Sequence, residues 1–193
     1  MDTSAWKRIG IVFAAVLCAA AVSAAASAGH AIVGTVDKVD TAAKTIAVKT
    51  VDGTVEVLHF TEKTAVMGAK DVAKVADLTG KSTYHFVVRY TEDGARKMAT
   101  GLEYVGDGVW KAARGTVVGV DHAARTVVVK TADDAEWTFD AGKHAVVESG
   151  RGIVRLGDET GEGLAKGAAV TVHYTGGRRQ EGRAFLLEGQ LRR

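Results

Sequence analysis

The chain has 193 residues, 47% of them apolar, and its 25 lysines and arginines nearly balance its 23 aspartates and glutamates. This length allows one or two small domains, and the charge balance argues against a surface devoted to nucleic acid, which needs a basic excess. Proline is absent and the only cysteine is Cys18. The chain after residue 28 therefore has no disulfide and no thiolate metal ligand.

The first 28 residues have the three parts of a secretory signal peptide. Two basic residues open the segment, the apolar run 9–22 follows, and Ala26-Ser27-Ala28 forms an A-x-A cleavage site. We therefore expect cleavage between Ala28 and Gly29. The mature protein is then exported, to the periplasm or the extracellular space.

Three other interpretations of this segment fit its residues less well. A buried core helix would need a polar second face, which the segment lacks. An uncleaved anchor over residues 9–28 is just long enough to span a bilayer, but its alanine-rich and serine-rich second half is weakly hydrophobic. A lipoprotein signal would use Cys18, but Leu17 stands where a small residue is required. Contact with a membrane is expected only if the leader is retained.

An internal repeat follows the leader. Residues 34–50 read GTVDKVDTAAKTIAVKT, and residues 115–131 read GTVVGVDHAARTVVVKT, with eleven of seventeen positions identical. Agreement at this level indicates a duplicated unit. We expect two domains, at 29–107 and 110–193.

Looser matches extend the repeat beyond these segments. Phe60 falls near Phe139, and Lys63-Thr64-Ala65-Val66 matches Lys143-His144-Ala145-Val146. Small gaps between such anchors are expected where loops differ in length.

The first copy is rich in β-branched residues with period-two alternation, which is typical of strands. Strands are predicted near 31–39, 44–50, 54–60, 83–91 and 95–105. Ile46 and Val48 should share one face of the second strand. Asp40, repeated as Asp121, should open a turn by bonding backbone N–H groups two residues on, and Asp52-Gly53 indicates a tight turn.

Between the third and fourth strands, residues 69–76 predict a short helix with Val72, Val75 and Ala76 on one stripe. The second copy has a glycine-rich stretch, 150–163, in its place. The order strand-strand-strand-helix-strand-strand is that of an OB-type barrel. We therefore expect an all-β fold of two tandem small OB-like five-stranded barrels, with the short helix in the first. A β-sandwich and a continuous open sheet remain as alternatives.

The framework pattern G-x-V-x-x-V-D followed by T-x-x-V resembles that of a bacterial family of exported OB-like domains of unknown function, often found in tandem. The residues that carry the resemblance are Gly34, Val36, Val39, Asp40, Thr45 and Val48, repeated at Gly115, Val117, Val120, Asp121, Thr126 and Val129. The resemblance implies an envelope-associated binding module and supplies no catalytic residues.

The sequence contains no catalytic pattern that indicates an enzyme. After the leader the only serines are Ser82 and Ser149, and neither lies in a G-x-S-x-G elbow. No histidine pair has zinc-ligand spacing, so we expect no metal and no cofactor. The alternative is a hydrolase with a site between the barrels, whose acids and bases would be His59, Asp140, His144 and Glu148.

OB barrels often bind single strands by stacking bases on aromatic rings in a basic groove. Aromatic and basic side chains of this kind are our candidate binding residues: Trp137, Tyr174, Arg151 and Arg155 in the second copy, and Tyr90 and Arg89 in the first. Nucleic acid is not the favoured ligand, because the aromatic content is only 6%. An anionic envelope polymer would meet the same arginines.

These observations favour an exported, non-enzymatic binding or interaction module. Its partner would be an envelope protein, a polymer or a small ligand. Two similar grooves on one chain would add avidity toward a repeating partner. Sensing of a small ligand or cation by the same barrels is a further hypothesis, and it predicts a ligand-dependent melting shift.

Overall fold

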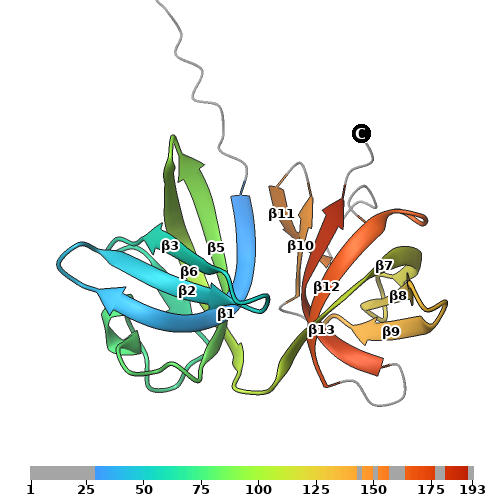
Figure 1. The fold of residues 1–193 in the computed structure, drawn as a ribbon, viewed down its shortest axis with the longest axis horizontal. Coiled ribbons are helices and arrows are strands. Elements are labelled where there is room, and N and C mark those ends of the chain that lie inside the picture. The colour runs from blue at the N-terminus through green and yellow to red at the C-terminus, as the bar shows by residue number, and fades with distance from the viewer. Residues whose placement is uncertain (1–28, 143–144, 150–151, 157–163, 177–180, 191–193) are drawn as a thin grey trace, which may run out of the picture.

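The computed structural model describes residues 29–142, 145–149, 152–156, 164–176 and 181–190, and this part of the chain is all-β (Figure 1). The expected leader, with Ala28 at its cleavage site, lies outside the described residues. So do Arg151, His144 and much of the glycine-rich stretch. Gly29 is the first residue of the first strand.

The first sheet has six strands in the order β3-β2-β1-β5-β6-β4. Its strands are β1 Gly29–Asp40, β2 Thr45–Thr50, β3 Val55–His59, β4 Ala65–Met67, β5 His85–Asp93 and β6 Arg96–Gly106. A single 3-10 turn, η1 Val75–Leu78, lies between β4 and β5.

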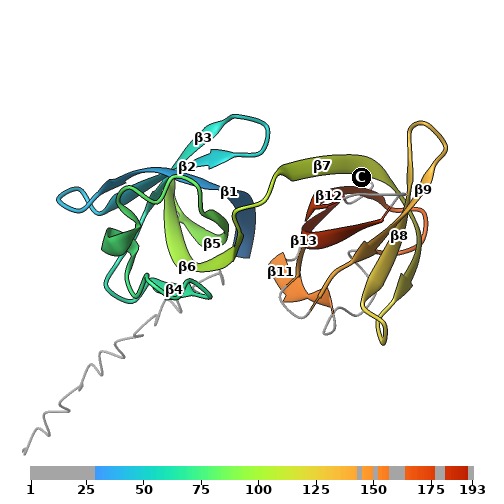
Figure 2. The same cartoon turned by 90° about the horizontal axis from the view of Figure 1, so that it is seen from below.

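The second sheet has seven strands in the order β11-β10-β13-β12-β7-β8-β9. Its strands are β7 Trp110–Asp121, β8 Thr126–Thr131, β9 Glu136–Asp140, β10 Val146–Ser149, β11 Gly152–Arg155, β12 Ala169–Thr175 and β13 Glu181–Gln190. The two sheets lie side by side, joined by the short link from β6 to β7 (Figure 2).

The first strand of each sheet in chain order, β1 or β7, pairs with the following strand, β2 or β8, in the same register. Gly34 pairs with Thr50 and Gly115 with Thr131, and each strand has a bulge three residues further on. A Cβ at either glycine would lie 2.3 Å from a carbonyl oxygen of the neighbouring strand. Only glycine fits at these two positions, where the backbones of neighbouring strands approach closely, which explains why both sheets have glycine there.

The turns after these strands are also alike. The Asp40 carboxylate accepts a hydrogen bond of 2.8 Å from the backbone N–H of Ala43, and Asp121 accepts one of 2.8 Å from Ala124. Each aspartate therefore bonds three residues on, not two as the sequence suggested. The bond fixes the turn in place of backbone pairing.

Each sheet wraps around its own apolar core, and the predicted alternation is confirmed. Ile46, Val48, Phe86 and Val88 are fully buried in the first core. The second core contains the matching side chains Val127, Val129, Val170 and Val172, together with Phe139 and Leu187. Burying each large apolar side chain contributes about 1.5–3 kcal/mol, so these cores hold the sheets without disulfides.

Two features of the predicted strand and helix order were wrong. The prediction of five strands per copy missed β4 in the first sheet and β10 and β11 in the second, because strands of three or four residues show no period-two pattern. The predicted helix over 69–76 is only the 3-10 turn η1. Val72, Val75 and Leu78 are buried while Ala76 is exposed. This spacing of three matches a 3-10 turn of three residues, not an α-helix.

Register also corrects two of the looser repeat matches. Ile46 pairs with Leu58 and Val127 with Phe139, so Leu58 is the counterpart of Phe139. Phe60 instead matches Ala141, since each donates its backbone N–H to the residue before the second strand. Likewise Val147, not Val146, corresponds to Val66, because they pair with Leu187 and Leu102. The match of Phe60 with Phe139 was misleading, because residues are equivalent only where they occupy the same register position and so face the same side of the sheet.

Candidate functional site

The two sheets contact each other through their outer faces. Six buried apolar residues form a cluster that spans the contact: Ala31, Val33, Val87, Trp110, Val146 and Leu186. Three come from β1 and β5, and three come from β7, β10 and β13. We call this contact the seam. Its apolar cluster holds the outer face of the first sheet against the second.

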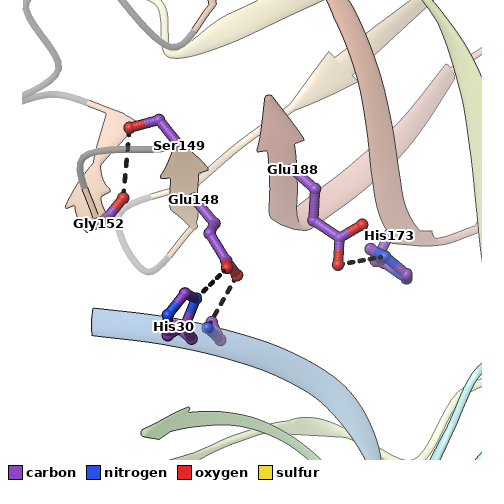
Figure 3. A network of polar contacts seen from close by, with 7 residues as sticks. His30, Glu148, Ser149, Gly152, His173 and Glu188 are labelled. Atoms are coloured by element: carbon purple, nitrogen blue, oxygen red, sulfur yellow. Dashed lines mark hydrogen bonds and ion pairs between the residues drawn. The ribbon is translucent and has the colours of Figure 1, made fainter. Parts of the chain in front are cut away.

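A polar link crosses the seam at the start of β1 (Figure 3). The Nδ1 atom of His30 lies 2.8 Å from Oε1 of Glu148, and the backbone N–H of Ala31 donates to Oε2 at 2.9 Å. The His30 ring also stacks on Tyr90, with centroids 5.3 Å apart. Both carboxylate oxygens of Glu148 are therefore occupied in holding β1 on β10.

A second histidine–glutamate pair lies beside the first, within the second sheet (Figure 3). His173 Nε2 is 3.3 Å from Oε1 of Glu188, and Glu188 pairs in register with Glu148. Neither ring nitrogen of His173, both covered from solvent, makes a well-oriented hydrogen bond within the described residues. Leaving a buried polar group without a hydrogen bond costs about 1–3 kcal/mol.

The first sheet has a tighter pair at the matching positions. Arg89 and Glu103 correspond in register to His173 and Glu188, and Arg89 Nη2 donates to Glu103 Oε2 at 2.7 Å. A charged arginine–glutamate hydrogen bond is short and strong, whereas the histidine of the second sheet lies further from its glutamate. The second sheet has histidine where the first has arginine, and its pair is therefore longer, at 3.3 Å against 2.7 Å.

A groove of about 420 Å³ opens on the seam beside the second pair. Its floor is the outer face of β7, β12 and β13, with Ala112, Arg114, Thr171, His173 and Glu188. Its opposite wall is β1 with the β2–β3 hairpin of the first sheet, through Ile32, Val33, Thr50, Val51, Asp52, Thr54 and Glu56. Sites for small molecules are concave, between packed units, and about 300–1,000 Å³ in volume.

Charged groups of both signs line this groove. Lys97 Nζ lies 2.6 Å from Glu56, so that carboxylate is paired. Hydrogen bonds from the Thr50 hydroxyl and the Thr54 backbone lower the pKa of Asp52, which keeps it ionised. Arg114 is exposed and has no ion-pair or hydrogen-bond partner in the described part of the chain. The groove thus presents one unpaired cation near two carboxylates, those of Asp52 and Glu188.

The aromatic residues predicted to bind a ligand lie mostly in the cores. Tyr174 is 5% exposed and packs between Phe139 and the half-buried Trp137, with ring centroids 5.0 and 5.9 Å away. Tyr90 is 8% exposed, and burial raises the pKa of its phenol. Neither tyrosine exposes a face for stacking. Alternation along β5 and β12 points these two rings into the cores.

The predicted arginines are brought together only in part. Arg89 and Arg155 line one cavity of about 380 Å³ with Val146, Ile153 and Val154. Arg89 is held by Glu103, which leaves Arg155 as the exposed cation of this cavity.

Of the alternative acids and bases, the three that the structure describes are not gathered into one site. His59 and Asp140 end equivalent strands of different sheets, and Glu148 is occupied at the seam. Another cavity, of about 490 Å³, is lined by Ser82, His85 and Asp107, but no hydrogen bond joins Ser82 to His85 within the described residues. Among those residues no group of three or more His, Cys, Asp or Glu is placed to hold a metal ion.

The groove residues Arg114, Thr171 and Glu188 were missed by the sequence analysis. Nothing in their local motifs indicates a site. The available signal was a contrast between copies: Arg114 stands where the first copy has Val33, and Thr171 where it has Val87. Polar residues replacing buried valines at outward positions mark a face with a different use.

Comparison with known proteins leaves the site to be interpreted from its geometry. No family model matches the chain, and no curated protein matches it. Within the described residues, none of the helical structure is long and apolar enough to cross a membrane.

Proposed function

We propose that this protein is an exported, non-enzymatic binding module whose ligand occupies the seam groove. One observation carries the proposal. Three outward positions that are apolar or tightly paired in the first sheet are Arg114, Thr171 and His173 in the second, and all three line the groove. Polar side chains gathered on one concave face, at positions that are apolar or paired in the first sheet, are what a binding site on a shared framework would require.

The proposal includes the finer architecture. We regard each sheet as an OB-like barrel, supported by the parallel pairs β3–β6 and β9–β13, each of which joins an end strand to a strand that is not its neighbour in the sheet order. Closure of this kind removes exposed strand edges, which suits a chain without disulfides.

A melting-temperature screen tests the binding function. The probes are free amino acids, dipeptides, sugars, nucleotides, polyamines and metal salts, and a ligand of the native state raises the melting temperature. His173→Arg should abolish the shift, because the longer side chain would pair with Glu188 as Arg89 pairs with Glu103 and would fill the groove. Lys111→Gln, on the same floor strand but outside the groove, is the matched control. A shift that survives His173→Arg would overturn the groove assignment, and the absence of any shift would overturn the binding function.

The intact mass of the protein after export tests the proposed location. We expect a chain that begins at Gly29, the first residue of β1. A full-length mass would show instead that the leader is retained, and the site would then work at a membrane surface.

A second candidate function is binding of an anionic polymer at the cavity of Arg89 and Arg155. The exposed cation Arg155, over an apolar base of Val146, Ile153 and Val154, favours it. Such binding should weaken steeply with salt. Titration with polyphosphate at two salt concentrations, on the native chain and on Arg155→Gln, would decide it: equal affinity of the two proteins excludes this cavity.

A further inference from the structure

The charges of the groove set narrow limits on what can occupy it. Arg114 supplies a guanidinium from β7 that has no partner among the described residues. Glu188 supplies a carboxylate from β13, and Asp52, held ionised by its turn, supplies another from the opposite wall. The remaining carboxylate, Glu56, is already neutralised by Lys97.

A ligand with a single charge meets a repelling group in this groove. A simple anion attracted to Arg114 would be repelled by Asp52 and Glu188. A simple cation attracted to these carboxylates would be repelled by Arg114. Like charges brought together in a partly desolvated site are costly, so this arrangement discriminates against both kinds of ligand.

We infer that the seam groove binds a small zwitterion of the amino-acid or short-peptide class, with its carboxylate on Arg114 and its ammonium near Glu188 and Asp52. The inference rests on the proposed binding function and names its ligand class. The groove volume of about 420 Å³ suits a ligand of this size. Thr171 and His173 form the floor beneath it.

The first sheet shows what the same face looks like without such a site. There Val33 and Val87 are 2% and 1% exposed within the seam cluster. The glutamate at the position of Glu188 is bonded to Arg89 at 2.7 Å. Within the described residues, the arginine of that face, Arg89, is already engaged by a carboxylate and is not free to bind an anion.

Titration of the full-length chain, followed by backbone amide chemical shifts, tests the inference. The probes are the free L-amino acids and L-alanyl-L-alanine. The tightest of these is then compared with its N-acetyl form, which lacks the ammonium, and its C-terminal amide, which lacks the carboxylate. We expect shifts at groove residues, and each blocked form should bind about tenfold more weakly, or worse, since each loses a charge-assisted contact.

Two variants test which residue binds the carboxylate of the ligand and which binds its ammonium. Arg114→Gln should remove the preference for the acid over the amide, and Glu188→Gln should reduce the preference for the free amine over the N-acetyl form. Lys111→Gln removes one positive charge from the same strand, outside the groove, and should leave both preferences unchanged.

The outcomes separate this inference from the proposed function. Equal binding of blocked and unblocked forms overturns the zwitterion assignment. Groove shifts with only acetate, methylammonium or an uncharged disaccharide overturn it too, while the proposed binding function stands. If no probe of any class shifts groove residues, both fail.

Discussion

In the first sheet the outer face of β1 and β5 carries Val33 and Val87, both nearly fully buried against the second sheet. In the second sheet the same positions hold Arg114 and Thr171, and they line a groove. One copy of the unit therefore uses its outer face to dock, and the other leaves part of that face open. A framework shared by the two sheets permits this, because each sheet has an apolar core of its own.

The largest loss of stability should come from substituting the glycines that occupy equivalent positions in the two sheets. Gly34→Ala and Gly115→Ala should each lower the free energy of unfolding by about 2–4 kcal/mol, because a Cβ would lie 2.3 Å from the carbonyl oxygen of Lys49 or Lys130. Chemical denaturation measures the loss. Gly119→Ala is the control, since a Cβ there meets nothing within 4 Å and its change should be small. If either Gly34→Ala or Gly115→Ala left the free energy of unfolding unchanged, the two sheets would not share this close approach of strands.

A smaller effect should come from cutting the polar link across the seam. Glu148→Ala removes the acceptor of both His30 and the Ala31 N–H and should cost about 1–2 kcal/mol. Calorimetry should show the unfolding transitions of the two sheets moving apart. Glu62→Ala is the matched control, because that side chain is 87% exposed and 3.6 Å from Lys44. Identical thermograms for the two variants would mean that Glu148 does not couple the sheets.

The smallest effect should appear with pH and should involve the first sheet alone. Burial lowers the pKa of His85 below the ordinary 6.5, opposed by a hydrogen bond to Thr83 and the charge of Asp107. The second sheet has Ala169 at this position, as pairing with Thr35 and Thr116 shows. The folded state binds fewer protons than the unfolded state, so the contribution of His85 to stability is present above about pH 6.5 and is lost as the pH falls.

The matching measurement compares the native chain with His85→Phe, which keeps a ring against Trp110. The difference in their unfolding free energies should change between pH 7 and pH 5, with a slope that corresponds to the uptake of less than one proton per molecule on unfolding. Because the other histidines are present in both proteins, their titration cancels. A difference that does not depend on pH would contradict the shifted titration of His85.

Much of each sheet could be predicted from the chain. The alternation around Ile46 and Phe86 is enough to assign buried faces, because a strand has a fixed period of two. Asp40 and Asp121 marked their turns, because their carboxylates act on neighbours only three residues away. The short strands and the 3-10 turn were missed, since three or four residues carry too little periodicity to be recognised.

The candidate site depended on contacts that the sequence does not display. The aromatic residues chosen for their chemistry, Tyr90 and Tyr174, proved to be core residues. The groove draws on β1 and the β2–β3 hairpin of one sheet and on three strands of the other. Its charges come from positions up to 136 residues apart, Asp52 and Glu188 among them.

The sequence by itself determined the longer strands, the turns at Asp40 and Asp121, the inward faces and the positions of Gly34 and Gly115, because each of these follows from local sterics or from a period of two along one segment. Only the tertiary structure decided which outward faces meet. Docking the two sheets buries Val33 and Val87 and leaves Arg114 facing a groove, and this difference arises from packing between segments distant in sequence. Side chains on an outward face look alike in a linear pattern until the partner surface is known.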